Sequence, residues 1–297
     1  MTAPAAASVR DAGVPEVAFV EIDTLWFQAG GTLCNLACAH CFISCSPTNH
    51  THEMMSLAQV LGFLDEAERL GVRDYGVTGG EPFLNVEIFE ILEAILARGP
   101  LLVLTNGMPI TRASAERLAR LAAASEYSLD VRISLESTDE AANDAVRGAG
   151  CYRKALDGVA HLAAVGIEPG IAVTRLDDGS TNAEIVASFG ALLRERGVSR
   201  PRIKVFEPFR IGAEAARARG YDSAERVTAD MMAGFDPRGL QCSTSRMATE
   251  RGVWVCPILV NEERGRMGAT LAETLRSFPL YSGACWTCHR FGVSCRA

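Results

Sequence analysis

No stretch of the sequence has the roughly 18 consecutive apolar residues that a membrane-spanning helix needs, and no segment is rich in lysine and arginine. The chain carries 29 Lys+Arg against 36 Asp+Glu, which gives a formal net charge of −7. A net-acidic chain without a basic run is poorly suited to binding a phosphate backbone. We therefore expect neither nucleic acid nor a membrane as a partner.

The first residues also lack the basic start and the continuous apolar core of a secretory signal peptide. We expect residues 1–21 to form a flexible leader and the protein to be cytoplasmic. Cytosolic thiols stay reduced, so ten cysteines among 297 residues favour metal binding over a disulfide framework.

The cysteines fall into two groups at opposite ends of the chain, which suggests two metal centres. The first group is Cys34, Cys38, Cys41 and Cys45, and the second is Cys242, Cys256, Cys285, Cys288 and Cys295. Cys45 and the isolated Cys151 are expected to be small buried apolar side chains rather than functional thiols. His50 and His52 lie in a polar loop and are expected to be solvated.

Between these groups, short apolar runs alternate with amphipathic segments of helix length. Six runs are predicted to be strands, namely Thr24–Phe27, Asp74–Val77, Leu101–Thr105, Leu129–Leu135, Ile167–Thr174 and Arg202–Phe206. Repeated strand–helix units imply a parallel sheet with helices outside it, either a partial or complete (β/α) barrel or an open doubly wound sheet. Functional residues should then follow the carboxyl ends of the strands.

The loop after the first predicted strand contains Cys34-x3-Cys38-x2-Cys41. Three thiolates can hold three irons of a [4Fe–4S] cubane and leave the fourth iron without a protein ligand. A zinc site is the alternative, with Cys45 or His50 as the fourth ligand.

The second predicted strand ends in Val77-Thr-Gly79-Gly80-Glu81-Pro82. Paired glycines let a ligand approach the backbone closely, and a carboxylate can receive an ammonium group.

In this order, the two motifs resemble those of the radical S-adenosylmethionine (SAM) superfamily, over roughly residues 22–207. The resemblance implies an α/β fold built on a partial (β/α)6 TIM-type barrel. It also implies a [4Fe–4S] cluster on Cys34, Cys38 and Cys41 whose open iron is chelated by SAM. One electron from that cluster cleaves SAM to a 5′-deoxyadenosyl radical, which takes a hydrogen atom from the substrate.

The same resemblance assigns further residues to SAM binding. Gly79, Gly80 and Glu81 correspond to residues at the methionine amino end, and His40 stands where the family usually has an aromatic residue against adenine. Five further residues resemble family positions that contact the methionyl group, the carboxylate or the ribose of SAM. They are Thr105, Asn106, Ser134, Glu136 and Arg147. Thr105, Ser134 and Arg147 are equally well read as turn, cap or surface residues.

After about Gly212 the alternation stops, and residues 212–297 are expected to form a small Cys-rich domain appended to a core of residues 22–211. Gly252 suggests a hairpin that brings Cys242 and Cys256 together. The segment resembles the twitch and SPASM extensions of radical SAM enzymes, which implies one auxiliary [4Fe–4S] cluster. Four of the five cysteines are its ligands, with Cys242 or Cys295 left over, and structural zinc is the alternative.

For the substrate, we expect a small polar natural product such as a sugar, an aminoglycoside or an oligosaccharide unit. The preferred reaction is epimerisation of a carbinol carbon, with Cys242 or Cys295 returning a hydrogen atom to the opposite face. Three alternatives stay open: a carbinol dehydrogenase, a maturase that crosslinks or epimerises a ribosomal peptide, and a non-enzymatic iron–sulfur or zinc redox module. A flavodoxin or ferredoxin is the expected reductant.

Overall fold

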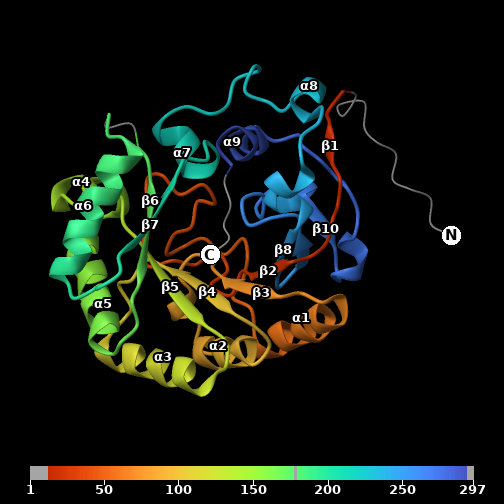
Figure 1. Ribbon diagram of the computed structural model, residues 1–297. Helices are drawn as coiled ribbons and strands as arrows, with labels where there is room; N and C mark the ends of the chain where they lie inside the picture. The colour runs from red at the N-terminus through yellow and green to blue at the C-terminus, as the bar shows by residue number, and fades with distance from the viewer. Residues whose placement is uncertain (1–12, 177–178, 293–297) are drawn as a thin grey trace.

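A nine-stranded sheet with helices along its outer face organises the protein (Figure 1). The structure is a computed structural model and describes residues 13–176 and 179–292. Six neighbouring strands run parallel in chain order, and they are β2 (Thr24–Phe27), β3 (Asp74–Val77), β4 (Leu101–Thr105), β5 (Leu129–Ser134), β6 (Gly170–Thr174) and β7 (Arg202–Phe206). The predicted strands and the partial barrel are confirmed.

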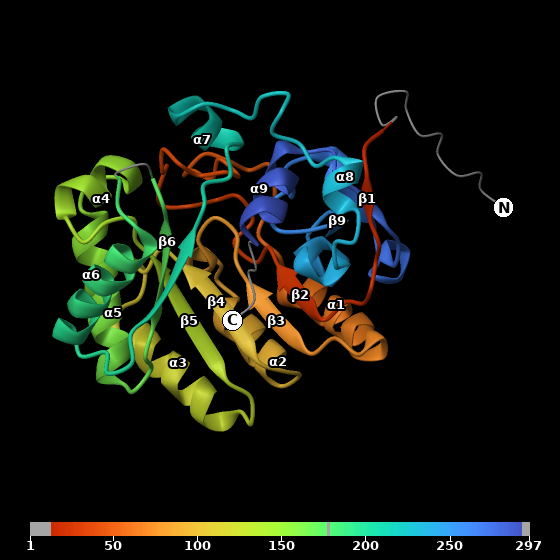
Figure 2. The same ribbon diagram turned by 45° about the horizontal axis from the view of Figure 1, so that its top comes forward.

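Six helices connect these strands and cover the convex side of the sheet (Figures 1 and 2). They are α1 (Leu57–Leu70), α2 (Ile88–Leu96), α3 (Arg112–Ala124), α4 (Glu140–Arg147), α5 (Cys151–Ala164) and α6 (Asn182–Glu195). Each αβ unit buries one apolar helix face on the sheet, as α2 does with Ile88, Ile91, Leu92, Ile95 and Leu96. No helix in the described part of the chain is long and apolar enough to cross a membrane.

Three strands of the C-terminal third extend the same sheet beyond β2. Strand β8 (Ser245–Thr249) pairs in parallel with β2, and β9 (Gly252–Trp254) and β10 (Arg266–Gly268) follow antiparallel. The predicted hairpin at Gly252 is present, and its φ of 119° is one that L side chains rarely adopt. The remaining helices are α7 (Gly212–Arg217), α8 (Ala229–Met232) and α9 (Gly283–Phe291).

The segment just before β2 is ordered, which differs from the expected flexible leader of residues 1–21. Strand β1 (Glu16–Val17) pairs antiparallel with β11 (Phe278–Pro279), and Val17 is only 1% exposed. The Val20 N–H also donates to the Ser243 carbonyl over 2.9 Å. Burial of an apolar side chain and ladder hydrogen bonds hold this segment. Residues 1–12 of that leader lie outside the described residues.

Candidate functional site

The loop from β2 to α1 contains the three predicted cluster cysteines. Backbone hydrogen bonds fix it both to its own later part and to the end of α4. The Cys34 N–H donates to the Ser46 carbonyl over 3.1 Å, and the Ala39 N–H donates to the Val146 carbonyl over 2.8 Å. Burial raises the pKa of Cys34 to about 11 and that of Cys38 to about 12, and in both cases the neighbouring cysteines add to the rise. The three side chains thus interact in one small, poorly solvated region.

Cys45 belongs to the same group of thiols, as a buried neighbour of Cys41. Hydrogen bonds from the Cys45 side chain and from its N–H, 3.3 Å from Cys41 Sγ, lower the pKa of Cys41 to about 6. The expected burial of Cys45 and Cys151 is confirmed. None of the nine described cysteines is in a disulfide.

The two glycines after β3 seat the cysteine loop against the sheet. A Cβ on Gly79 would lie 2.7 Å from the Gly30 nitrogen, and the φ of Gly79 is 135°. A Cβ on Gly80 would overlap the Leu33 carbonyl oxygen and touch Cys34 Cβ. Only glycine fits both positions, because the chain's own loop fills the space where side chains would be.

The carboxylate of Glu81 points from the same turn to the end of β4. It accepts hydrogen bonds from Thr105 Oγ1 over 2.8 Å, from the Asn106 N–H over 2.8 Å and from the Phe83 N–H over 3.1 Å. Its burial is complete and raises its pKa to about 7. These three donors come from two loops, so Glu81 ties together the loops after β3 and β4.

The Thr105–Gly107 turn connects Glu81 with the first cysteine. Asn106 Nδ2 lies 2.7 Å from Asn35 Oδ1 and 3.8 Å from Cys34 Sγ. The structure thus brings the predicted residues Glu81, Thr105 and Asn106 together beside the cysteine loop.

Glu136, two residues beyond β5, is the centre of a second buried group. Its carboxylate lies 2.9 Å from His40 Nε2 and 2.7 Å from Arg147 Nη1, and it accepts the Thr174 N–H over 2.6 Å. Burial alone would raise the pKa of Glu136, but His40 and Arg147 outweigh it and lower this pKa to about 2. Ser134, at the end of β5, is half-buried two residues before Glu136.

Two polar atoms in this group have no hydrogen-bond partner among the described residues. They are His40 Nδ1 and Arg147 Nε, and both are buried. Unpartnered buried polar atoms are costly, so such atoms suit a site completed by a polar ligand. The pairing of His40 with Glu136 has no signal in the sequence, because a loop and a strand end meet only in the fold.

In the C-terminal third, four of the five predicted cysteines line a single apolar cavity. Cys242 precedes β8, Cys256 follows β9, and Cys285 and Cys288 share one face of α9 because they are three residues apart. Burial raises the pKa of Cys242 to about 11 and that of Cys285 well above its ordinary value. Cys295, the fifth, lies outside the described residues.

Within residues 13–176 and 179–292, no three His, Cys, Asp or Glu side chains converge as the ligands of a single metal ion do. A cubane places a different iron before each thiolate, so its ligands need not converge on one point. The donor sets of both groups, three thiols and four thiols in apolar surroundings, therefore suit iron–sulfur clusters.

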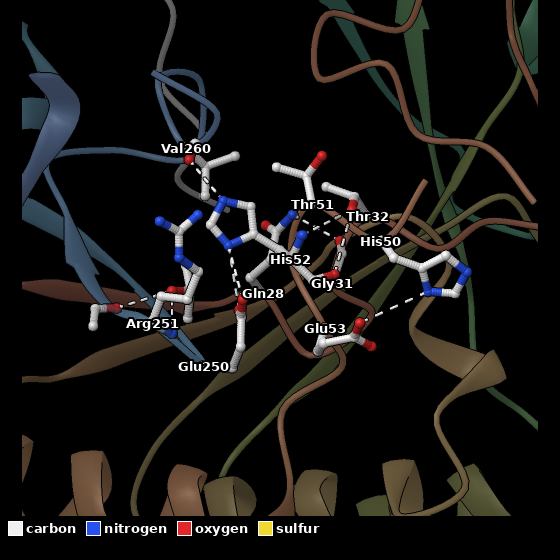
Figure 3. A network of polar contacts seen from close by, with 12 residues as sticks. Gln28, Gly31, Thr32, His50, Thr51, His52, Glu53, Glu250, Arg251 and Val260 are labelled. Atoms are coloured by element: carbon white, nitrogen blue, oxygen red, sulfur yellow. Dashed lines mark hydrogen bonds and ion pairs between the residues drawn. The ribbon is translucent and has the colours of Figure 1, made fainter. Parts of the chain in front are cut away.

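A buried histidine connects the cysteine loop with the C-terminal hairpin (Figure 3). His52 is 1% exposed, so the expectation of a solvated side chain is wrong. Its Nδ1 lies 3.2 Å from Glu250 Oε1 and its Nε2 lies 2.9 Å from the Val260 carbonyl. The two regions that hold the cysteine groups are thus bonded directly to each other.

A partial barrel with a three-cysteine loop after its first parallel strand defines a class of enzymes that bind an iron–sulfur cluster with an open site. Residues 30–189 match the sequence profile of the radical SAM superfamily. The chain belongs to this superfamily. It is a radical SAM enzyme, and membership implies SAM and a [4Fe–4S] cluster.

Two relatives of the chain have different activities, one a maturase and the other a nucleotide cyclase. The chain is 34% identical over 167 residues to mycofactocin maturase MftC of Mycobacterium tuberculosis, which covers 54% of this chain and 41% of that protein. It is 28% identical over 266 residues to GTP 3′,8-cyclase 2 of M. tuberculosis, covering 86% of this chain and 68% of that one. The chain thus matches less than half the length of the maturase.

Solved structures share the fold. Streptococcus suis SuiB bound to S-adenosylmethionine superposes with a TM-score of 0.66 at 17% identity, covering 88% of this chain and 67% of SuiB. Native anSMEcpe with bound AdoMet gives a TM-score of 0.61 at 15% identity, covering 84% of this chain and 79% of that one.

Proposed function

We propose that this radical SAM enzyme is a maturase that modifies a peptide, and that it carries an auxiliary [4Fe–4S] cluster besides the one that cleaves SAM. The class rests on the three-cysteine loop seated against Gly79 and Gly80. The peptide substrate is supported by the 34% identity to mycofactocin maturase MftC. The sequence alone favoured a sugar epimerase, and neither of the two named relatives is one.

The residues around the first cluster have separate roles in this proposal. Cys34, Cys38 and Cys41 hold the cluster, which when bound supplies the electron that cleaves SAM to methionine and the 5′-deoxyadenosyl radical. Arg147 Nε is available to a carboxylate and His40 Nδ1 to a polar group of the ligand, since both atoms are buried without a partner in the described chain. Ser134, two residues before Glu136, is a further donor.

Glu81 and Glu136 act on this site through other residues. Glu81 fixes Thr105 and Asn106, and Asn106 in turn reaches Cys34. Glu136 fixes the positions of His40 and Arg147 by direct ion pairs. Both carboxylates are buried, so they position groups without exchange with water.

For the auxiliary cluster, the four cavity-lining thiols are the proposed ligands, namely Cys242, Cys256, Cys285 and Cys288. A set of four leaves no open iron, so the cluster would supply one-electron transfer rather than substrate binding. Cys295 is then the cysteine left over and the remaining candidate for a hydrogen-atom donor.

A small-molecule substrate is the second candidate. The match to GTP 3′,8-cyclase 2 extends over 86% of this chain, which is more than the match to the maturase covers. Reductants of the flavodoxin or ferredoxin class suit either candidate.

The cluster assignment is tested by metal analysis of anaerobically reconstituted protein. We expect about eight irons per chain, from two cubanes, and we expect the Cys34/Cys38/Cys41→Ala triple variant to keep about half. Stoichiometric zinc with no iron in that variant would exclude the auxiliary cluster and leave the first cluster in place.

The substrate is tested by incubating reduced enzyme and SAM with two panels, short peptides encoded beside its gene and sugars or nucleotides. A maturase makes 5′-deoxyadenosine and changes the mass of a peptide, whereas a response only to small molecules contradicts the peptide assignment. In D2O, epimerisation adds one deuterium, and comparison of Cys242→Ala with Cys295→Ala shows whether either thiol supplies it. Crosslinking or oxidation instead removes two hydrogens.

A further inference from the structure

Arg246, on β8, is a fully buried guanidinium whose hydrogen-bond acceptors are all backbone carbonyls. Nη1 donates to Cys242 O and Ser245 O over 2.7 Å each, and Nη2 donates to Thr274 O over 2.7 Å and to Arg276 O over 3.4 Å. The side chain is 0% exposed. Among the described residues, no carboxylate lies within ion-pair distance of it.

The other two buried arginines of the described chain each have a carboxylate partner. Arg147 lies 2.7 Å from Glu136, and Arg132 lies 3.3 Å from Asp130. A buried cation without a counter-charge is strongly destabilising, and neutral carbonyls compensate it only in part. The Phe19 ring, 4.9 Å from the guanidinium carbon, adds a modest attraction. Among the three buried arginines of the described chain, Arg246 is thus the one without a carboxylate partner.

The cavity beside β8 lies next to this charge. Arg246 is bonded to the carbonyl of Cys242, whose thiol lines that cavity with the thiols of Cys256, Cys285 and Cys288. Burial lowers the pKa of Arg246 to about 10, while the Cys242 and Cys256 thiols favour its charged form and partly offset this effect. Four thiolates around an oxidised cubane carry a net negative charge, and reduction adds one more.

We propose that Arg246 is the counter-charge of the auxiliary cluster and raises its reduction potential. A fixed positive charge in a poorly solvated interior stabilises the more negative, reduced cluster more than the oxidised one. This inference rests on the auxiliary cluster of the proposed function and adds the residue that sets its readiness to accept an electron. Arg246 acts on the potential through space and touches no substrate.

The test measures the midpoint potential of the auxiliary cluster by EPR-monitored redox titration. The full-length Cys34/Cys38/Cys41→Ala variant serves as the parent, because its only iron is at the second cysteine group. Three further substitutions are made in it. Arg246→Gln removes the charge, Arg246→Lys keeps it, and Arg276→Gln removes a nearby charge that is exposed to solvent. Iron content is measured for each.

We expect Arg246→Gln to keep the iron and to lower the equilibrium constant for one-electron reduction at least tenfold, which is about 59 mV. Arg246→Lys and Arg276→Gln should stay within a few-fold of the parent, the second because solvent screens an exposed charge. Loss of iron in Arg246→Gln but not in Arg246→Lys would also support a counter-charge.

Two results would overturn the inference. One is an iron-loaded Arg246→Gln variant with the parent's midpoint potential, and the other is equal loss of iron in the Gln and Lys variants, which would mean that guanidinium shape matters and charge does not. A parent variant that contains no iron is a different result. It removes the auxiliary cluster itself and with it that part of the proposed function.

Discussion

Glu136 is a buried carboxylate on which two side chains converge, since His40 Nε2 lies 2.9 Å and Arg147 Nη1 lies 2.7 Å from its Oε1. Glu136→Gln leaves Arg147 buried without its counter-charge, and we expect a loss of about 3–5 kcal/mol in the free energy of unfolding at pH 7. Urea unfolding measures it. Glu140→Gln is the matched control, because the Glu140–Arg153 pair is exposed and should contribute about 0–1 kcal/mol.

The pH dependence of that difference follows from the pKa of Glu136. Its folded-state pKa of about 2 lies below the ordinary 4.5, so the ionised carboxylate stabilises the folded protein. This contribution is fully present above pH 4.5 and is lost as the pH falls through 4.5 toward 2. The gap between wild type and Glu136→Gln should therefore narrow on acidification, and a gap that stays constant would contradict the assignment.

Substitution of Glu81 is expected to change the affinity for SAM. Glu81→Ala removes the buried acceptor of Thr105 and Asn106, so the turn beside Cys34 loses its anchor. We expect SAM affinity to fall by about 1.4 kcal/mol, which is tenfold, because the displaced turn no longer lines the SAM site, while iron content changes little. Isothermal titration under anaerobic conditions measures the affinity, and unchanged binding would show that Glu81 has no part in SAM recognition.

At the scale of elements, the turn after β3 packs directly against the cysteine loop, so a side chain added in this turn would displace the loop. Gly80→Ala places a Cβ against the Leu33 carbonyl, so the loop that carries Cys34 must move. We expect the variant to lose most iron of the first cluster and to keep that of the second. Gly62→Ala is the control, since a Cβ at this exposed position in α1 meets nothing and should stabilise the helix by roughly 0.5–1 kcal/mol. Equal iron content in both variants would contradict this role.

The strands could be predicted because most are short, largely apolar runs between helix-length segments, as in a parallel sheet covered by helices. Thr24–Phe27 and Arg202–Phe206 have the bounds that the sequence predicted. The pairing of β8 with β2 could not be predicted, since residues far apart in the chain carry no local sign of which edge they join. The same holds for β1 and β11.

In the candidate site too, residues within one motif could be predicted from the sequence, and contacts between distant segments could not. Motif spacing predicted Cys34, Cys38, Cys41 and the glycine turn, because one loop contains each motif. The pairing of His40 with Glu136 and the burial of Arg246 depend on segments that meet only after folding, and a lone arginine in a polar segment carries no sign of burial.

At the scale of the whole molecule, the predicted boundary after residue 211 can be tested by truncation. A chain of residues 1–211 lacks β8, so the fully buried strand β2 becomes an open edge with unpaired N–H and C=O groups. We expect this fragment to aggregate, with the full-length protein at the same concentration as the control. Size-exclusion chromatography checks it, and a soluble, monodisperse fragment would show that the core folds without its C-terminal third.

The β2–β8 pairing also has a consequence during synthesis on the ribosome. Thr24 pairs with Ser245, so about 220 residues must be added before the first barrel strand gains its second neighbour. At about 5–20 residues per second, this takes roughly 10–40 seconds. Throughout that interval the nascent chain exposes a hydrophobic edge next to the cysteine loop, whose contact with Glu250 also forms only at the end. Protection of this edge from aggregation is therefore a late event in the life of the nascent chain.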